Sequence, residues 1–275
     1  MFLILQMVII GGVTGVLSGL LGAGGGFIMV PLLNLVGFPM REAAGLSILY
    51  VGFTSAAGTF RHAKLGTVDW ILTLLVLAGA TPMSLLGAYF TAILSNSALE
   101  LIFASVVLAT SIAYLAWGMK EQPSENRHTN RPRSWHRLSR KKRVANVEFA
   151  YKVDSLSAVG VGAFAGLLTG LLGIGGGWLK VPLFKLLLRI PLPIAIGTSL
   201  ASILFPAMVG AIGHWRLGNI PLEGSVPLIL SGMLGSQFGA ILAVRLPGSW
   251  LERSLVTLLV IAAVYMFARG FGLLW

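Results

Sequence analysis

Residues 15–32 read GVLSGLLGAGGGFIMVPL, and residues 166–183 read GLLTGLLGIGGGWLKVPL. A shift of 151 residues superposes the two stretches. A shift of 152 then pairs residues almost to the end of the chain: Gly45 with Gly197, Ser47 with Ser199, His62 with His214, and Glu100 with Glu252. Each half therefore has an apolar segment interrupted by three glycines and followed by Val-Pro. In a membrane protein, such interruptions at matching positions of two halves point to a substrate site.

The composition indicates a membrane protein. Hydrophobic residues make up 56% of the 275 residues, charged residues only 11%, and the mean hydropathy is +0.87, which excludes a soluble domain. Apolar runs long enough to cross a bilayer recur along the chain, at residues 2–22, 43–60, 70–94, 101–118, 155–172, 194–213, 224–244 and 251–268. We predict an all-α polytopic membrane protein with two homologous repeats of about four spans each. Each repeat has a Gly-rich broken or re-entrant helix.

The positive charge is concentrated between the two halves. Ten of the twenty Lys and Arg residues lie between Lys120 and Lys152. We therefore divide the chain into a first transmembrane repeat (1–118), a basic cytoplasmic linker (119–153) and a second transmembrane repeat (154–275). The linker is read either as a solvated loop that obeys the positive-inside rule, or as a surface for anionic lipids or a cytosolic partner. Nucleic-acid binding is not expected.

The relative direction of the two repeats stays open. If residues 26–38 are re-entrant, each half has four spans, the repeats are parallel and both termini lie inside; this arrangement is slightly favoured. If the short helix and its glycine stretch complete a crossing, each half has five elements and the repeats are inverted. The parallel arrangement puts Lys180, Lys185 and Arg189 outside, whereas the inverted one sends His214, Arg216 and Arg269 outside.

The glycine triplets suggest an anion cradle. Gly24, Gly25 and Gly26, and their counterparts Gly175, Gly176 and Gly177, can adopt conformations that turn successive backbone amides toward one point. The short helix that follows would add free amides and a partial positive charge at its N-terminus. The alternative is that these glycines only allow close helix crossing.

The doubled motif G-[LI]-x-G-x-G-G-G-x-[LIM]-x-V-P, the segment Gly197-Thr198-Ser199-Leu200 and the His-x-[KR]-Leu-Gly loops together resemble the TauE/SafE-type sulfite exporter family. The resemblance covers essentially the whole chain outside the linker. It implies a transporter of the bacterial or archaeal inner membrane. The substrates it implies are small anions, often sulfur-containing, such as sulfite, sulfonates or thiosulfate. The first half departs from the pattern with Gly45-Leu46-Ser47.

Hydroxyl and cationic side chains near the breaks are further candidates for substrate contacts. Ser47, Thr198 and Ser199 could donate to anion oxygens, or could instead bond a carbonyl of their own helix. Lys180 stands where the first half has Met29, and a lysine inside a membrane is a functional candidate by default. Its alternative is a lysine that reaches the interface from the helix end.

His62 and His214 occupy equivalent places at the end of a span. They are candidates for a gate or a protonatable group, and the alternative is a histidine that caps a helix C-terminus. We expect no catalytic residues, no metal site and no cofactor, because the predicted spans contain no paired carboxylates, nucleophile–base set or ligand cluster, and the chain lacks cysteine. An anion channel and a non-transporting scaffold remain alternative functions, and a homodimer remains open.

Overall fold

A computed structural model describes residues 2–113, 115–116, 137–144, 147–221 and 224–273. The first half contains five helices: α1 (Phe2–Leu21), α2 (Gly26–Leu35), α3 (Met40–Lys64), α4 (Trp70–Phe90) and α5 (Asn96–Ala113). Two antiparallel strands follow, β1 (Arg137–Val144) and β2 (Val147–Asp154). The second half contains α6 (Ser155–Leu172), α7 (Gly177–Leu186), α8 (Leu192–Ala201), α9 (Leu204–Arg216), α10 (Ser225–Ala243) and α11 (Gly248–Gly270).

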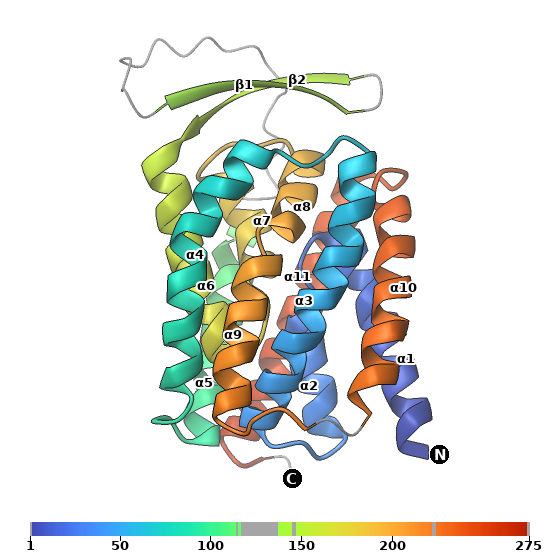
Figure 1. Cartoon of the computed structure of the whole chain (residues 1–275), viewed down its shortest axis with the longest axis vertical. Coiled ribbons are helices and arrows are strands. Elements are labelled where there is room, and N and C mark those ends of the chain that lie inside the picture. Colours follow the sequence, from blue (N-terminus) through green and yellow to red (C-terminus); the bar gives the residue numbers. More distant parts are fainter. Residues whose placement is uncertain (1, 114, 117–136, 145–146, 222–223, 274–275) are drawn as a thin grey trace.

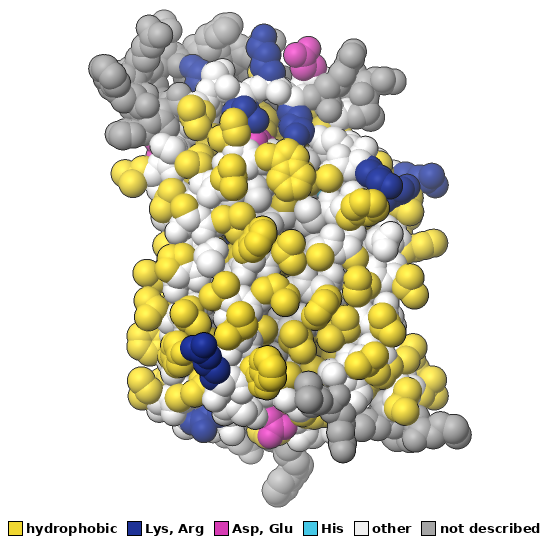
Figure 2. All heavy atoms as spheres, in the orientation of Figure 1, with side chains coloured by type: hydrophobic (Ala, Val, Ile, Leu, Met, Phe, Trp, Pro, Cys, Tyr) yellow, Lys and Arg dark blue, Asp and Glu magenta, His cyan; other side chains and the backbone are white. Residues whose placement is uncertain are grey.

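Within the described residues, eight helical segments are long and apolar enough to cross a membrane. Seven are single helices, and the eighth is the pair α8–α9, which is counted as one segment, Leu192–Arg216. Each one coincides with an apolar run predicted from the sequence. Figure 2 shows apolar side chains over the flank of the molecule, as lipid contact requires, and Lys and Arg side chains toward the two ends. The polytopic helical membrane fold is therefore confirmed.

Two helix pairs pack so closely that only glycine fits between their backbones. A Cβ on Gly15 of α1 would lie 2.3 Å from the carbonyl oxygen of Gly232 in α10. A Cβ on Gly166 of α6 would lie 2.2 Å from the carbonyl oxygen of Ala80 in α4. Small residues that repeat at helical spacing allow membrane helices to approach in this way. Much of the chain's glycine is thus used in the pairs α1–α10 and α4–α6 (Figure 1).

The two halves run in opposite directions through the molecule. The loop after α3 contacts the second half, where a Cβ on Gly197 of α8 would lie 2.4 Å from Oγ1 of Thr67. The loop after α9 contacts the beginning of α3, where a Cβ on Gly45 would lie 2.1 Å from the carbonyl oxygen of Asn219. Because α3 begins near one loop and ends at the other, these loops lie at opposite ends (Figure 1). Of the two arrangements left open by the sequence, the structure has the inverted one. The slightly favoured parallel arrangement is wrong, because each short helix, α2 or α7, acts as a fifth element of its half.

Salt bridges at the two ends agree with this course. Arg269, near the end of α11, bonds Glu100 at the start of α5 (Nε to Oε1, 3.0 Å) and the carbonyl oxygen of Asn34 at the end of α2 (Nη1 to O, 2.8 Å). At the opposite end, Lys185 of α7 bonds Glu252 of α11 (Nζ to Oε1, 2.5 Å). Both described chain ends lie at the end marked by Arg269 (Figure 1).

The hairpin β1–β2 lies across the end of the helical bundle to which α7 and the α3–α4 loop belong (Figure 1). Its residues alternate between the two faces, as in any strand. Val144, Tyr151 and Val153 are buried and share an apolar cluster with residues of the bundle, including Leu72 and Ile194. Part of the predicted linker is thus a folded element that packs on the helices, which the sequence analysis did not predict. The remainder, residues 119–136 and 145–146, lies outside the described residues.

Candidate functional site

The two glycine stretches interrupt the helices at matching positions. Helix α1 ends at Leu21, and α2 begins at Gly26 after two glycines with positive φ, Gly24 (φ 76°) and Gly25 (φ 77°). In the second half, Gly175 (φ 78°) and Gly176 (φ 63°) separate α6 from α7. A side chain disfavours this left-handed conformation, so the breaks require glycine.

The two breaks meet each other inside the molecule. A Cβ on Gly26 would lie 2.6 Å from the carbonyl oxygen of Ile174, and a Cβ on Gly177 would lie 2.5 Å from that of Gly22. The backbone of each break therefore rests directly on the backbone of the other. All glycines of the two triplets are buried, so the structure brings these six predicted site residues together.

Ser47 and Ser199 brace this crossing. The hydroxyl of Ser47 on α3 donates to the carbonyl oxygen of Gly173 (2.8 Å), and that of Ser199 on α8 donates to the carbonyl oxygen of Gly22 (3.0 Å). Each serine thus bonds the break of the opposite half rather than a carbonyl of its own helix. In this conformation both hydroxyl groups donate to carbonyl oxygens of the protein, so neither proton is free to bind a substrate.

Backbone amides at the start of both short helices lack protein acceptors. Among the described residues, no oxygen accepts a hydrogen bond from the amides of Gly24, Gly25, Gly26 or Phe27. The same holds for the equivalent amides in the second half, those of Gly175, Gly176, Gly177 and Trp178. A buried amide without an acceptor is costly, and a ligand or a water molecule is the usual partner at a helix N-terminus.

Two buried side chains beside these amides also lack partners in the described part of the chain. They are the hydroxyl of Ser18 and the indole Nε1 of Trp178, both on fully buried residues. Ser18 adjoins the first break, because a Cβ on Gly25 would lie 3.2 Å from its Cβ. Trp178 follows Gly177 directly. The matching hydroxyl of Thr169 is different, because it donates to the carbonyl oxygen of Ala165 in its own helix (2.7 Å).

Lys180 is fully buried in α7 and does not reach the membrane surface. Its Nζ donates to the carbonyl oxygen of Ser202 (3.0 Å) and to the Ser202 hydroxyl (3.2 Å). Ser202 directly precedes Ile203, whose side chain touches both breaks. No carboxylate among the described residues forms a salt bridge with Lys180. The first half has Met29 and Tyr50 at the corresponding positions, so a buried lysine at this place belongs to one half only.

Two apolar side chains fill the space between the breaks. A Cβ on Gly175 would lie 2.5 Å from Cγ1 of Val51, and one on Gly24 would lie 3.2 Å from Cδ1 of Ile203. Val51 and Ile203 are equivalent under the 152-residue shift, so the repeat alignment could have identified both. In this conformation these side chains occupy the space beside both glycines.

Two hollows lie elsewhere in the described part of the molecule. One of about 10 Å³, enough for about one water molecule, is lined by residues that include Leu21, Ile196 and Glu252. A surface hollow lies at Ile212, Trp215 and Arg216. Neither is lined by a glycine of the breaks.

The remaining predicted residues lie farther out along the helices. Nε2 of His62 bonds the carbonyl oxygen of Gly19 (3.1 Å), and Nε2 of His214 bonds that of Gly170 (2.8 Å). His62 therefore joins α3 to α1, and His214 joins α9 to α6. Both side chains are buried. The hydroxyl of Thr198 accepts a hydrogen bond from the amide of Asp69 (2.9 Å), in the loop that precedes α4.

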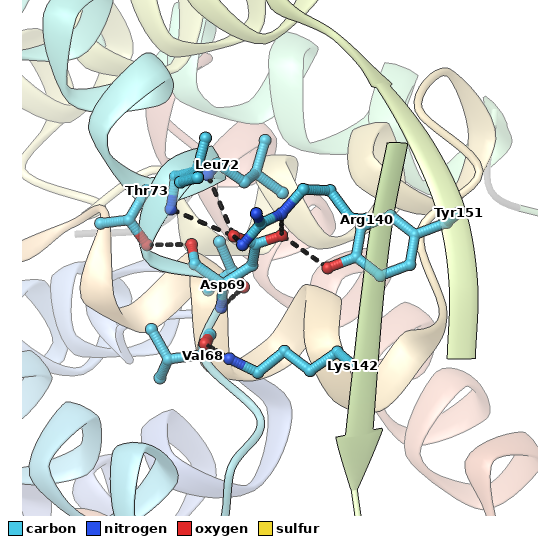
Figure 3. A network of polar contacts seen from close by, with 9 residues as sticks. Val68, Asp69, Leu72, Thr73, Arg140, Lys142 and Tyr151 are labelled. Carbon is cyan, nitrogen blue, oxygen red and sulfur yellow. Dashed lines mark hydrogen bonds and ion pairs between the residues drawn. The ribbon is translucent and has the colours of Figure 1, made fainter. Parts of the chain in front are cut away.

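Asp69 is the centre of a polar network that sequence reasoning missed (Figure 3). Its fully buried carboxylate accepts from Arg140 of β1 (Nε to Oδ2, 3.1 Å; Nη2 to Oδ1, 3.0 Å) and from the hydroxyl of Tyr151 in β2 (2.6 Å). It also caps α4 by accepting from the amides of Ile71 and Leu72. No local pattern in the sequence joins Asp69 to residues 71 and 82 positions later.

The network shifts the acidity of its members. Burial raises the pKa of the Asp69 carboxyl, but hydrogen bonds from Arg140, Tyr151 and the amide of Leu72, together with the Arg140 charge, outweigh it. The net pKa of Asp69 lies below its ordinary value. Burial and the bond to Asp69 raise the pKa of Tyr151, and burial lowers the pKa of Lys142. Asp69 therefore stays ionised and Tyr151 stays a hydrogen-bond donor at neutral pH.

The chain is similar to several transporters from bacteria and archaea. A probable membrane transporter protein of Bacillus subtilis (strain 168), YunE, is 27% identical over 242 residues that cover 85% of this chain and 86% of that protein. A probable membrane transporter protein of Haemophilus influenzae is 28% identical over 286 residues, covering 97% and 98%. One from Methanocaldococcus jannaschii is 25% identical over 254 residues, covering 83% and 84%. No solved structure matches the chain.

The family model "Sulfite exporter TauE/SafE" matches residues 7–266, which include both glycine breaks and all of the helices that enclose them. Together with the eight membrane-length helices and the transporters to which the chain is similar, this match establishes a membrane transporter. The chain belongs to the TauE/SafE sulfite exporter family.

Proposed function

We propose that this chain is a secondary transporter that exports small anions, in particular sulfur-containing ones such as sulfite, sulfonates or thiosulfate. The anion binds between the two glycine breaks, near the middle of the membrane. The family's description supports the substrate class. The chemistry of the breaks supports an anion: buried amides at two helix N-termini, with the Ser18 hydroxyl and the Trp178 indole N–H beside them, all lack protein acceptors in the described residues.

Lys180 is the observation that carries the proposal. In this proposal Lys180 is a fully buried ammonium. Among the described residues it donates only to Ser202, and no carboxylate there supplies a counter-charge. An unpaired charge in the membrane interior is costly. An anion that enters between the breaks would supply that counter-charge, and the free amides would bind its remaining oxygens.

The two halves form an inverted repeat in this proposal. Transporters built this way bind substrate between repeats at the midplane and open to each side in turn. Val51 and Ile203 then separate the two access routes in the closed conformation. An apolar closure of the site is what a carrier needs between its two open states, whereas a channel needs a continuous open path in its conducting state.

The hairpin end lies in the cytoplasm in this proposal. Basic residues gather there: Arg61, Lys64, Arg140, Lys141, Lys142, Lys152, Lys185, Arg189, Arg245 and Arg253. Only Arg41, Arg216 and Arg269 lie at the opposite end among the described residues. The positive-inside rule assigns the more basic end to the cytoplasm. An inside-negative potential then drives an anion outward with about 2.3 kcal/mol per charge per 100 mV.

The test replaces Lys180 by methionine, the residue at the equivalent position of the first half. Thermal unfolding of the purified protein is followed with sulfite, thiosulfate, sulfoacetate, taurine, sulfate and simple carboxylates. An anion at about 100 times its dissociation constant should stabilise the parent protein by about 2.7 kcal/mol. Lys180→Met should remove most of that stabilisation, because it removes the central charge.

The matched control is Lys185→Met in the same helix, which breaks the salt bridge to Glu252 away from the breaks. It should keep the anion-dependent stabilisation. Lys180→Met itself should remain folded, because replacing a buried charge by an apolar side chain is often neutral or stabilising. If Lys180→Met responds to every anion as the parent does, the ammonium is not part of the site and the proposal fails.

A further inference from the structure

The hairpin β1–β2 grips the α3–α4 loop at two consecutive residues. Arg140 and Tyr151 bond the carboxylate of Asp69, and the ammonium of Lys142 bonds the carbonyl oxygen of Val68 (Figure 3). The bond between Arg140 and the carboxylate is bidentate, the geometry that most restricts both partners. Since Asp69 is fully buried, its carboxylate is shielded from water, whereas the Arg140 side chain is partly exposed.

The same loop is joined to the wall of the proposed anion site. The amide of Asp69 donates to the hydroxyl of Thr198 on α8 (2.9 Å), and Thr67 packs against Gly197. The next residue, Ser199, bonds the carbonyl oxygen of the first break. The contacts therefore run without a gap from the hairpin through Asp69 to α8 and on to the breaks.

At the other end of the molecule, the described residues contain no such contact between a hairpin and a loop. Position 221 corresponds to Asp69 under the 152-residue shift and is Pro221, which has neither a carboxylate nor an amide hydrogen. The hairpin has no counterpart there among the described elements. Among the described elements, the contact between the hairpin and the α3–α4 loop is thus found at one end of the molecule only.

We propose that the hairpin is a latch that holds the cytoplasmic side of the transport pathway closed, and that Asp69 is the positioning residue through which it acts on α8. The inference rests on the proposed transport function. For the site to open toward the cytoplasm, the α3–α4 loop and α8 must separate, and the bonds of Arg140, Tyr151 and Lys142 oppose that movement. Releasing the latch shifts the population toward the form open to the cytoplasm.

The test uses the chain's lack of cysteine. Thr59→Cys places a thiol in the half of α3 nearer the hairpin, at a residue that is 8% exposed. A membrane-impermeant maleimide is applied to inside-out vesicles. Arg140→Gln should raise the labelling rate about tenfold, the effect expected when a closed state loses one charge-assisted contact. Lys141→Gln, at the next position of β1 and therefore on its opposite face, should leave the rate unchanged.

A second reporter separates a latch from general loosening. Ala211 of α9 is the repeat counterpart of Thr59 and is also buried. Labelling of Ala211→Cys in right-side-out vesicles should stay the same or fall with Arg140→Gln, because opening is confined to the hairpin end. Equal acceleration at both reporters would mean that the substitution only destabilises the protein, and would overturn the proposal.

A milder variant keeps the test decisive if Arg140→Gln does not fold. Tyr151→Phe removes one hydrogen bond to Asp69 while keeping the ring that packs on the helices. It should raise labelling at Thr59→Cys by a smaller factor, and no change would overturn the latch. Labelling needs no substrate, so a failure to detect anion binding contradicts the transport proposal and leaves this result unaffected.

Discussion

At the scale of single residues, Asp69 makes three kinds of contact. Its carboxylate caps α4 and accepts from two residues of the hairpin, and its backbone amide donates to the hydroxyl of Thr198 on α8. An asparagine at position 69 could still cap α4, but it could not accept a charge-assisted bidentate bond from Arg140. The role of Asp69 thus depends on its ionised form.

This dependence gives a prediction about pH. The pKa of Asp69 is lowered in the folded state relative to 3.8, so the unfolded state binds a proton first as the pH falls. The stability that Asp69 contributes is therefore complete above about pH 4 and is lost as the pH falls through the folded-state pKa. Thermal unfolding in detergent between pH 7 and pH 3 should show this loss.

Asp69→Asn is the control for that measurement. The variant should unfold more readily at pH 7 than the parent, and the difference between the two should shrink below about pH 4. A constant difference across the whole range would mean that ionisation of Asp69 contributes nothing to stability.

At the scale of elements, the close packing of α4 and α6 predicts a clear difference between two glycines of one helix. Gly166→Ala would put a Cβ 2.2 Å from the carbonyl oxygen of Ala80, so the helices must move apart at a cost of about 1–3 kcal/mol. Gly160→Ala in the same helix meets nothing within 4 Å and should gain up to about 1 kcal/mol from helix propensity. Unfolding of both variants in detergent measures the difference.

One outcome would contradict this prediction. If Gly166→Ala were as stable as Gly160→Ala, the backbones of α4 and α6 would not approach as closely as the structure indicates.

Much of the element level could be predicted from the sequence, because membrane-length apolar runs are a strong signal in a chain with few charges. The breaks were visible because Gly24-Gly25-Gly26 is repeated 151 residues later. The hairpin was not predicted, since its strands are rich in Lys and Arg and read as a linker; only the alternation of Tyr151 and Val153 with polar residues marks its inner face.

The site was predictable in part for a similar reason. Residues in the doubled motif could be located by the repeat, and they do meet in space. The partners of Lys180 and Asp69 could not, because Ser202 and Arg140 lie 22 and 71 residues away and no periodicity links them. Ser47 and Ser199 bond across the two halves, and a sequence pattern does not disclose which carbonyl a hydroxyl will reach.

At the scale of the whole molecule, the opposite course of the two halves predicts which side of the membrane each loop faces. Lys64 and Arg216 are repeat counterparts at the ends of α3 and α9, and both are exposed. In the cysteine-free chain, Lys64→Cys should react with an impermeant thiol reagent only from the cytoplasmic side, and Arg216→Cys only from the opposite side. Intact cells and inside-out vesicles provide the two exposures.

The two thiols act as controls for each other, because each has the same helix-end setting. Labelling of both from one side would mean that the repeats are parallel and that the described course of the chain is wrong.

The interlocked breaks also bear on how the protein is made. The carbonyl of Gly22 accepts from the hydroxyl of Ser199, 177 positions later, and the backbone of Gly26 rests on that of Ile174, so each break is completed by residues of the other half. When the first half leaves the ribosome and enters the membrane, the partners of its break do not yet exist. Helices α1 to α5 therefore enter the bilayer with an unfinished centre, and the native contacts of both breaks form only once residues of α6 to α8 have been synthesised.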